Sequence, residues 1–157
     1  MNVHTSNNAE LFFKALEDIW VAEQSWLGSP NNAVWHCTQA AEKIMKGFLK
    51  CLNMDYSYGH DLKELLDVIE PLIVLSSDVT ENIIFLNRYI LRLRYKNMPT
   101  DPTQEDAKDA IVKIKHILQA FNSNPKISQF MNEAKEVHKK VLKANYEKYG
   151  KLAESEN

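Results

Sequence analysis

All three arginines of the chain lie within seven positions, in the segment NRYILRLRYKN at residues 87–97. The other sixteen basic residues are lysines, and they are spread along the whole sequence. An arginine side chain presents a flat fork of N–H donors that can bind a phosphate or a carboxylate through two hydrogen bonds, which a lysine cannot do. The segment is therefore a candidate site for a phosphate-bearing ligand. The alternative is the solvated face of a helix.

Helical phase separates the three arginines. At 100° per residue, Arg88 and Arg92 project with Tyr95 away from the apolar side of the predicted helix. Arg94 falls instead at the flank of that apolar side. Because an unpaired guanidinium is costly to bury, we expect Arg94 to pair with a carboxylate, a carbonyl or a ligand, or to lie at a groove or subunit boundary.

Two further groups of polar residues could support the same chemistry. One is a stripe at steps of three and four along the second predicted helix, formed by His36, Gln39, Lys43, Lys46 and Lys50. It is either a solvated face or a weakly cationic strip that faces phosphates or a partner. The other is His60, which precedes the predicted helix cap Asp61 and could act as a general base, as a ligand, or as a hydrogen-bonding group that fixes the loop. The candidate ligand-binding residues are Arg92, Arg94, Tyr95, Lys43, Lys46 and His60.

Other kinds of site lack their sequence patterns. The five histidines show neither HExxH nor any paired-ligand spacing, and no GxSxG nucleophile motif occurs. With only four glycines there is no glycine-rich phosphate loop. Cys37 and Cys51 are isolated, so we expect them to pack as small hydrophobic residues. The sequence thus predicts no metal site, no cofactor and no catalytic residues.

Composition fits one globular domain. The chain has 157 residues, of which 45% are hydrophobic and 25% are charged, and its net charge of −2 argues against a protein that coats nucleic acid. The first nine residues are polar and no apolar run is long enough to cross a bilayer. We therefore expect a cytoplasmic protein with no membrane contact.

Apolar residues recur with a helical period throughout, and no segment alternates as a strand does. Five long helices and one short helix are predicted, at about residues 8–27, 30–52, 61–70, 79–96, 103–121 and 124–150. Short connections between them favour an all-α, up-and-down antiparallel bundle of four to five core helices with an additional C-terminal helix. We expect residues 1–122 to form the bundle. Residues 123–157 are expected to form an amphipathic helix, packed on the bundle or at a dimer interface, followed by a frayed tail.

Four segments in this order resemble the HEPN domain, a nucleotide-binding domain of higher eukaryotes and prokaryotes. They are WHCTQAAEKIMKGFLK at 35–50, YGHDLKELL at 58–66, LRYKNMP at 93–99 and PTQEDAKDAI at 102–111. The resemblance covers about residues 8–122. It implies a compact helical bundle, often a homodimer. Many members are encoded beside a small nucleotidyltransferase and act in toxin–antitoxin systems, whereas others are metal-independent ribonucleases.

The ribonucleases of this family carry an arginine followed, after four to six residues, by a histidine. No arginine of this chain has a histidine at that distance. Arg92 and Asn97 keep the spacing, but an amide cannot take up or release a proton near neutral pH. Arg94-Tyr95 instead resembles the Arg-Tyr pair that non-nuclease members carry at this place.

Three functions follow from the sequence. The leading one is a non-catalytic, dimeric HEPN-type module that binds a nucleotide, RNA or another phosphate ligand, or that partners a nucleotidyltransferase. The second is a divergent metal-independent ribonuclease that uses Arg92 with Asn97 or His60. The third is a purely structural or interaction bundle.

Overall fold

The computed structural model describes residues 4–56, 59–92 and 101–150. Its helices are α1 (Glu10–Ser25), α2 (Pro30–Cys51), α3 (Leu62–Ile69), α4 (Ser77–Arg92), α5 (Gln104–Asn122) and α6 (Ser128–Asn145), and a π-helical turn (Tyr146–Gly150) follows α6. The described residues contain no strand. The predicted all-α bundle is therefore confirmed.

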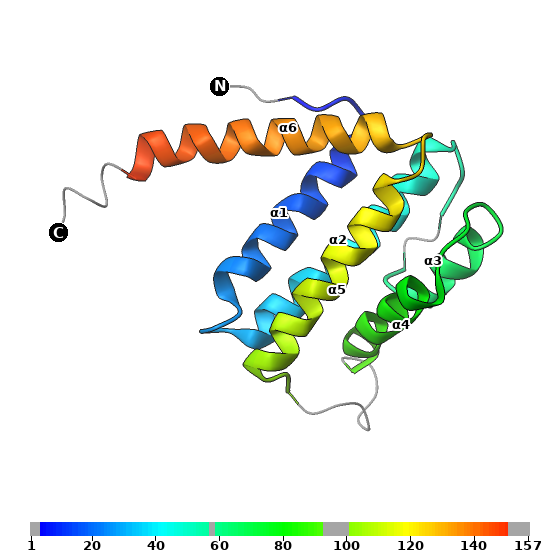
Figure 1. Cartoon of the computed structure of the whole chain (residues 1–157), viewed down its shortest axis with the longest axis horizontal. Helices are drawn as coiled ribbons and strands as arrows, with labels where there is room; N and C mark the ends of the chain where they lie inside the picture. The colour runs from blue at the N-terminus through cyan, green and yellow to red at the C-terminus, as the bar shows by residue number, and fades with distance from the viewer. Residues whose placement is uncertain (1–3, 57–58, 93–100, 151–157) are drawn as a thin grey trace.

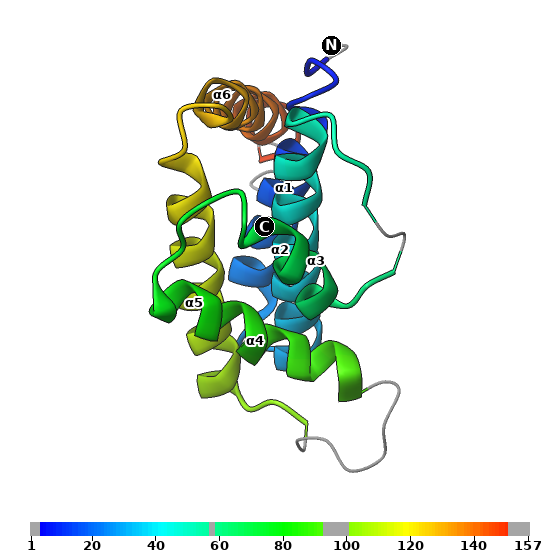
Figure 2. The ribbon, with the colours of Figure 1, turned by 90° about the vertical axis from the view of Figure 1, so that its right-hand side faces the viewer.

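Helix α2 is the centre of the bundle. It packs against α1, α3, α4 and α5, while α6 crosses the end of the bundle (Figure 1). Turning the molecule by 90° shows α3 and α4 covering a different side of α2 from α1 (Figure 2). The core is filled by large side chains with less than 2% exposure, among them Phe12, Phe48, Phe121, Ile44 and Leu66. Because α2 has neighbours on several sides, most of its side chains are buried, and few positions remain for a polar site.

The contact between α1 and α2 depends on a glycine. A Cβ atom added at Gly47 would lie 2.8 Å from Cε1 of Phe12, which is closer than such atoms approach in real structures. The missing side chain at Gly47 therefore leaves room for a fully buried aromatic ring.

Helix ends agree with the predicted caps at some places and differ at others. Asp61 caps α3 by accepting a hydrogen bond from the Lys63 backbone N–H at 2.9 Å, as expected. Ser29 precedes Pro30 at the start of α2, but its side chain makes no cap hydrogen bond. The sixth helix was predicted to start at about Asn124, where Asn-Pro has the pattern of a cap, but it begins at Ser128 because the Asn124 side chain accepts a hydrogen bond from the Lys126 N–H and forms a local turn instead.

Helix α6 packs most closely on the bundle near its start, and farther along the ring of His138 still meets that of Phe13 on α1, with 6.0 Å between the ring centres. Ile127, Met131 and Ala134 are buried, and the carboxylate of Glu133 accepts hydrogen bonds from the backbone N–H and the hydroxyl of Ser6. Beyond Ala134 no described residue is fully buried, and the helix extends past the edge of the bundle (Figure 1). The apolar face predicted for the whole helix is thus fully buried only over its first turns.

None of the helices in the described part of the chain is long and apolar enough to cross a membrane.

Candidate functional site

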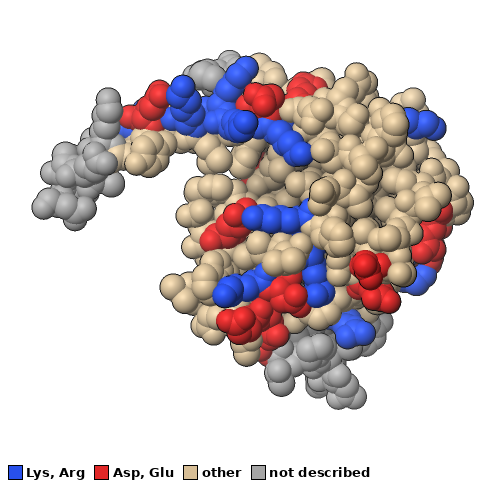
Figure 3. Space-filling view, viewed as in Figure 1, with Lys and Arg blue, Asp and Glu red and all other residues tan. Residues whose placement is uncertain are grey.

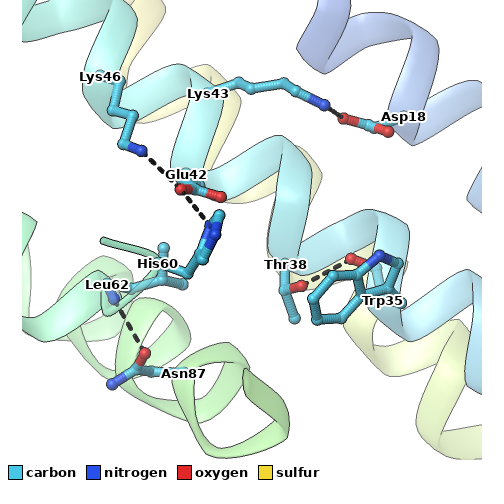
Figure 4. Close-up of polar contacts among 9 residues, drawn as sticks. All are labelled: Asp18, Trp35, Thr38, Glu42, Lys43, Lys46, His60, Leu62 and Asn87. Atoms are coloured by element: carbon cyan, nitrogen blue, oxygen red, sulfur yellow. Dashed lines mark hydrogen bonds and ion pairs between the residues drawn. The ribbon is translucent and has the colours of Figure 1, made fainter. Parts of the chain in front are cut away.

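The polar stripe predicted on α2 is present as a narrow strip on a mostly buried helix. His36, Gln39, Lys43, Lys46 and Lys50 are all half-buried, whereas the residues between them are buried. The strip is only partly a free cationic surface, because two carboxylates pair with His36, Lys43 and Lys46, while Lys50 donates to the side-chain oxygen of Asn7. Figure 4 shows the pair of Lys43 with Asp18 on one side of α2 and the contacts of Glu42 with Lys46 and His60 on the other.

The first carboxylate is Asp18, from the buried side of α1. Its side chain is 11% exposed. Its Oδ1 lies 2.8 Å from Nδ1 of His36, and its Oδ2 accepts a hydrogen bond from the ammonium of Lys43. Asp18 thus joins α1 to two positions of α2, and the predicted ligand-binding residue Lys43 is directed toward α1.

The second carboxylate is Glu42, which comes from α2 itself and has a side chain only 5% exposed. Its Oε1 accepts a hydrogen bond from Nζ of Lys46 at 2.7 Å and lies 2.9 Å from Nδ1 of His60. The Lys46 ammonium also lies 5.7 Å from the centre of the Tyr56 ring, within reach of a cation–π interaction. A buried carboxylate needs partners of this kind, since an unpaired one would be costly to desolvate.

His60 is the most accessible member of this group. Its side chain is 56% exposed, while its Nδ1 is held by Glu42. The contact restrains the orientation of the ring through Nδ1, so that Nε2 is the other nitrogen of a half-exposed imidazole. A ring held in this way can present Nε2 to a ligand, either as a hydrogen-bonding group or as a proton acceptor.

Asn87 ties this histidine loop to α4. The amide is 4% exposed. Its Oδ1 accepts a hydrogen bond from the backbone N–H of Leu62 at 2.9 Å, and its Nδ2 donates to Oδ1 of Asp61 at 2.9 Å. Because Asp61 and Leu62 directly follow His60, the two bonds fix the start of α3, and with it the histidine, against the arginine-bearing helix.

The sequence prediction missed Asn87, although a signal for it was present. The residue follows Leu86 on the apolar side of the predicted helix, where a polar amide needs a partner if it is buried. The sequence around Asn87 does not identify these partners, because Asp61 and the Leu62 backbone N–H lie about 25 positions earlier.

Arg88 and Arg92 lie in the last turns of α4. Arg88 is exposed, as its helical phase predicts. Arg92 is the last residue of α4. Arg94 and Tyr95, which were also predicted to bind a ligand, lie outside the described residues. Of the predicted site residues, the structure therefore brings Lys46 and His60 together through Glu42, and it places Lys43 against Asp18.

Neither cysteine has the character of a nucleophile. Burial, with a smaller effect from the charges of Asp18 and Glu23, raises the pKa of Cys37 to about 12. Burial also raises the pKa of Cys51, whose thiol donates to the Asn8 carbonyl at 3.6 Å. The reactive form of cysteine is the thiolate, so both behave as packed side chains near neutral pH. The described residues also contain no cluster of three or more histidine, cysteine, aspartate or glutamate side chains that could hold a metal ion.

Comparison with known proteins identifies the fold to which this site belongs. The family model of the HEPN domain matches residues 9–127. The chain belongs to the HEPN domain family. The match includes Glu42, Lys46, His60 and the whole of α4, and its last residue directly precedes α6. No curated protein and no solved structure matches this HEPN domain.

Membership of the family places the chain among nucleotide-related or ribonuclease-like helical modules. Two of the four sequence segments that carried the resemblance, residues 35–50 and 58–66, meet in space, and Asn87 of α4 contacts the second of them. Glu42 and Lys46 come from the first and His60 and Asp61 from the second, whereas the segment at 93–99 lies outside the described residues.

Proposed function

We propose that this HEPN domain is a non-catalytic module that binds the phosphate of a nucleotide or an RNA at the arginine-bearing end of α4, beside His60. The observation that supports the proposal most strongly is the pair of hydrogen bonds from Asn87 to Asp61 and Leu62. They hold the start of α3 at a point on α4 that is five residues before Arg92, or roughly 7.5 Å along the helix axis.

The charges of the described residues favour a phosphate site at the arginine-bearing end of α4 over one on the polar strip of α2. Asp18 and Glu42 each pair with a lysine of α2, so Lys43 and Lys46 contribute little free positive charge. We assign these two lysines to holding the buried carboxylates in place. The direct contacts to phosphate are assigned to Arg92 and His60, with Arg94 and Tyr95 added from the sequence prediction. Arginine forks suit a phosphate, and a tyrosine ring suits a base.

Calorimetric titration with AMP tests the proposal. We expect saturable binding to the wild-type chain and a dissociation constant about 10- to 100-fold higher for Arg92→Ala, because a hydrogen bond to a charged group contributes about 1.5–3 kcal/mol. Lys126→Ala is the matched control, since it removes one exposed cation from the loop before α6. Arg94→Ala is measured in parallel because the sequence assigns that residue to the same ligand.

A null titration for wild type would remove the nucleotide proposal. The arginine-bearing end would then be assigned to a protein partner, for which the family resemblance offers a small nucleotidyltransferase of a toxin–antitoxin pair. Equal binding by wild type and by both arginine variants would show that nucleotides bind elsewhere on the chain.

The contact between His60 and Glu42 favours a second candidate function, a divergent metal-independent ribonuclease. A carboxylate at Nδ1 of a half-exposed imidazole is an arrangement that orients a general base toward its substrate. In that role Nε2 of His60 would accept the proton of a ribose 2′-hydroxyl. The absence of the family's Arg-x4–6-His spacing from the sequence weighs against it.

Incubation of RNA with the protein in chelator-containing buffer separates the two functions. The ribonuclease hypothesis requires cleavage that is lost in both His60→Ala and Arg92→Ala. The binding-module proposal requires that the RNA remain intact while Arg92→Ala still weakens its binding.

A further inference from the structure

The end of α6 and the π-helical turn after it border a groove whose other wall is α1. The groove has a volume of about 630 Å³. This volume falls within the range of about 300–1,000 Å³ that is usual for small-molecule sites. Figure 3 shows the hollow beneath this part of α6. Its walls are mostly apolar or aromatic: α1 contributes Trp20 and Val21, and the facing segment contributes Val141, Leu142, Tyr146 and Tyr149.

Three aromatic side chains of the groove are open to solvent. Trp20 is 42% exposed, Tyr146 is 73% exposed and Tyr149 is 54% exposed. The face of an aromatic ring carries partial negative charge and attracts cations, and tryptophan does so most strongly. The ring of Tyr149 already has the Lys148 ammonium 5.0 Å from its centre, although Lys148 does not line the groove. Trp20 and Tyr146 have no such contact within the described residues, so their rings are the ones open to a cation from solution.

A carboxylate adds negative charge to the same groove. Glu17 lines the groove three residues before Trp20, so the two side chains project from the same face of α1. Glu17 is exposed, and no described residue forms an ion pair with it. The histidine of the groove, His138, is neutral near pH 7 because burial lowers its pKa, against a smaller opposing effect of Glu17. The residues that line the groove thus carry one negative charge and no positive charge near neutral pH.

We propose that the groove binds a small organic cation, which consists of an alkylated ammonium group on an apolar body. The ammonium lies between the carboxylate of Glu17 and the rings of Trp20 and Tyr146, and the apolar body packs against Val141 and Leu142. Aromatic rings bind such ammonium groups well because an alkylated cation is weakly hydrated, and the acid supplies the countercharge. A neutral apolar ligand would leave Glu17 beside a desolvated surface without a partner, and an anion would be repelled by it.

This inference is independent of the proposed function. The groove lies between α1 and α6, whereas the proposed phosphate site lies between α3 and α4. The two ligands also have opposite charge, so AMP should not displace the cation. Failure of nucleotide binding would leave the cation site untouched, and the converse also holds.

Calorimetric titration of the full chain with three aromatic probes of different charge tests the proposal. The probes are benzyltrimethylammonium, which is a cation, benzyl alcohol, which is neutral, and benzenesulfonate, which is an anion. We expect saturable binding of the cation, binding of benzyl alcohol that is at least about tenfold weaker, and no binding of the anion. High salt should weaken the binding of the cation, because it screens the exposed carboxylate.

Two substitutions locate the bound cation. Glu17→Gln keeps the size of the side chain and removes its charge, and it should raise the dissociation constant of benzyltrimethylammonium about fivefold. Trp20→Leu keeps an apolar side chain and removes the ring, and it should raise the same constant about three- to fivefold. The matched controls are Glu147→Gln and Trp35→Leu, since both residues are exposed and neither lines the groove. Glu17 and Trp20 are exposed as well, so neither change removes a core contact, and circular dichroism at 222 nm checks that helix content is retained.

Three results would overturn the inference. A wild-type chain that binds none of the probes would show that the groove is not a site for organic cations. Benzyl alcohol binding as tightly as the cation would show that the groove takes apolar bodies without regard to charge. A cation affinity that stays unchanged in both Glu17→Gln and Trp20→Leu would place the bound cation elsewhere on the chain.

Discussion

Replacing Asn87 by alanine removes the connection between the histidine loop and α4. Two bonds are lost, from the Leu62 N–H to Oδ1 and from Nδ2 to the Asp61 carboxylate. Leu62 is 0% exposed, so its N–H is left buried without a partner. Alanine cannot replace either bond, and the small cavity left by the amide offers no new contact.

The expected loss of stability follows from these two bonds. An unpaired buried N–H costs about 1–3 kcal/mol, and the bond to the partly exposed Asp61 contributes about 0.5–1.5 kcal/mol after solvent exchange. We therefore expect Asn87→Ala to lower the free energy of unfolding by about 2–4 kcal/mol. With a urea m-value of about 2 kcal/mol/M for a domain of this size, the unfolding midpoint should fall by about 1–2 M.

Urea unfolding followed by circular dichroism at 222 nm measures this change, and Asn82→Ala is the control. Asn82 lies on the same helix, and its amide makes only an exposed contact with His116 at 3.3 Å. Both substitutions gain the same helix propensity, so the difference between them isolates the buried bonds. If Asn87→Ala shifts the midpoint no further than Asn82→Ala, Asn87 does not hold the site together and the reasoning is wrong.

Three further predictions concern the fold. Gly47→Ala should destabilise the protein by about 1–3 kcal/mol through the close approach of a buried ring, whereas Gly28→Ala, where a Cβ meets nothing within 4 Å, should cost less than about 0.5 kcal/mol in the same thermal melts. Thr103→Ala breaks the capping box of α5 and should cost about 1 kcal/mol, while Ser29→Ala, which removes no cap bond, should cost clearly less; equal losses in urea titrations would contradict the cap assignment. Burial lowers the pKa of His138, so as pH falls below its ordinary value of 6.5 the unfolded chain binds the proton first and the free energy of unfolding decreases. His138→Phe should flatten that decrease between about pH 7 and pH 5, and an unchanged slope would exclude this histidine as its source.

The helices were predictable because their signals are local. Each has an apolar face with a helical period and ends at glycine, proline or a capping side chain, which a single segment is enough to show. The start of α6 was placed too early because Asn124-Pro125 has the pattern of a cap, yet the asparagine side chain closes a turn with Lys126 instead. A cap and a local turn compete for the same side chain, and the sequence alone does not decide between them.

The candidate site was predictable only in part, because its connections are long-range. The stripe on α2 and the ion pair between Glu42 and Lys46 follow from helical spacing, and both are present. The contact of Glu42 with His60 joins residues 18 positions apart, and that of Asp18 with Lys43 joins residues 25 apart. Such pairs depend on how the helices pack, so spacing within one helix cannot reveal them.

The proposed phosphate site at His60 and the arginine-bearing end of α4 can be observed by NMR of the histidine rings during titration with AMP. We expect a saturable change in the resonances of His60 in wild type, a loss of that change in Arg92→Ala, and no change at His116 on α5. Unchanged His60 resonances at saturating AMP, or a response that is the same in Arg92→Ala, would contradict it.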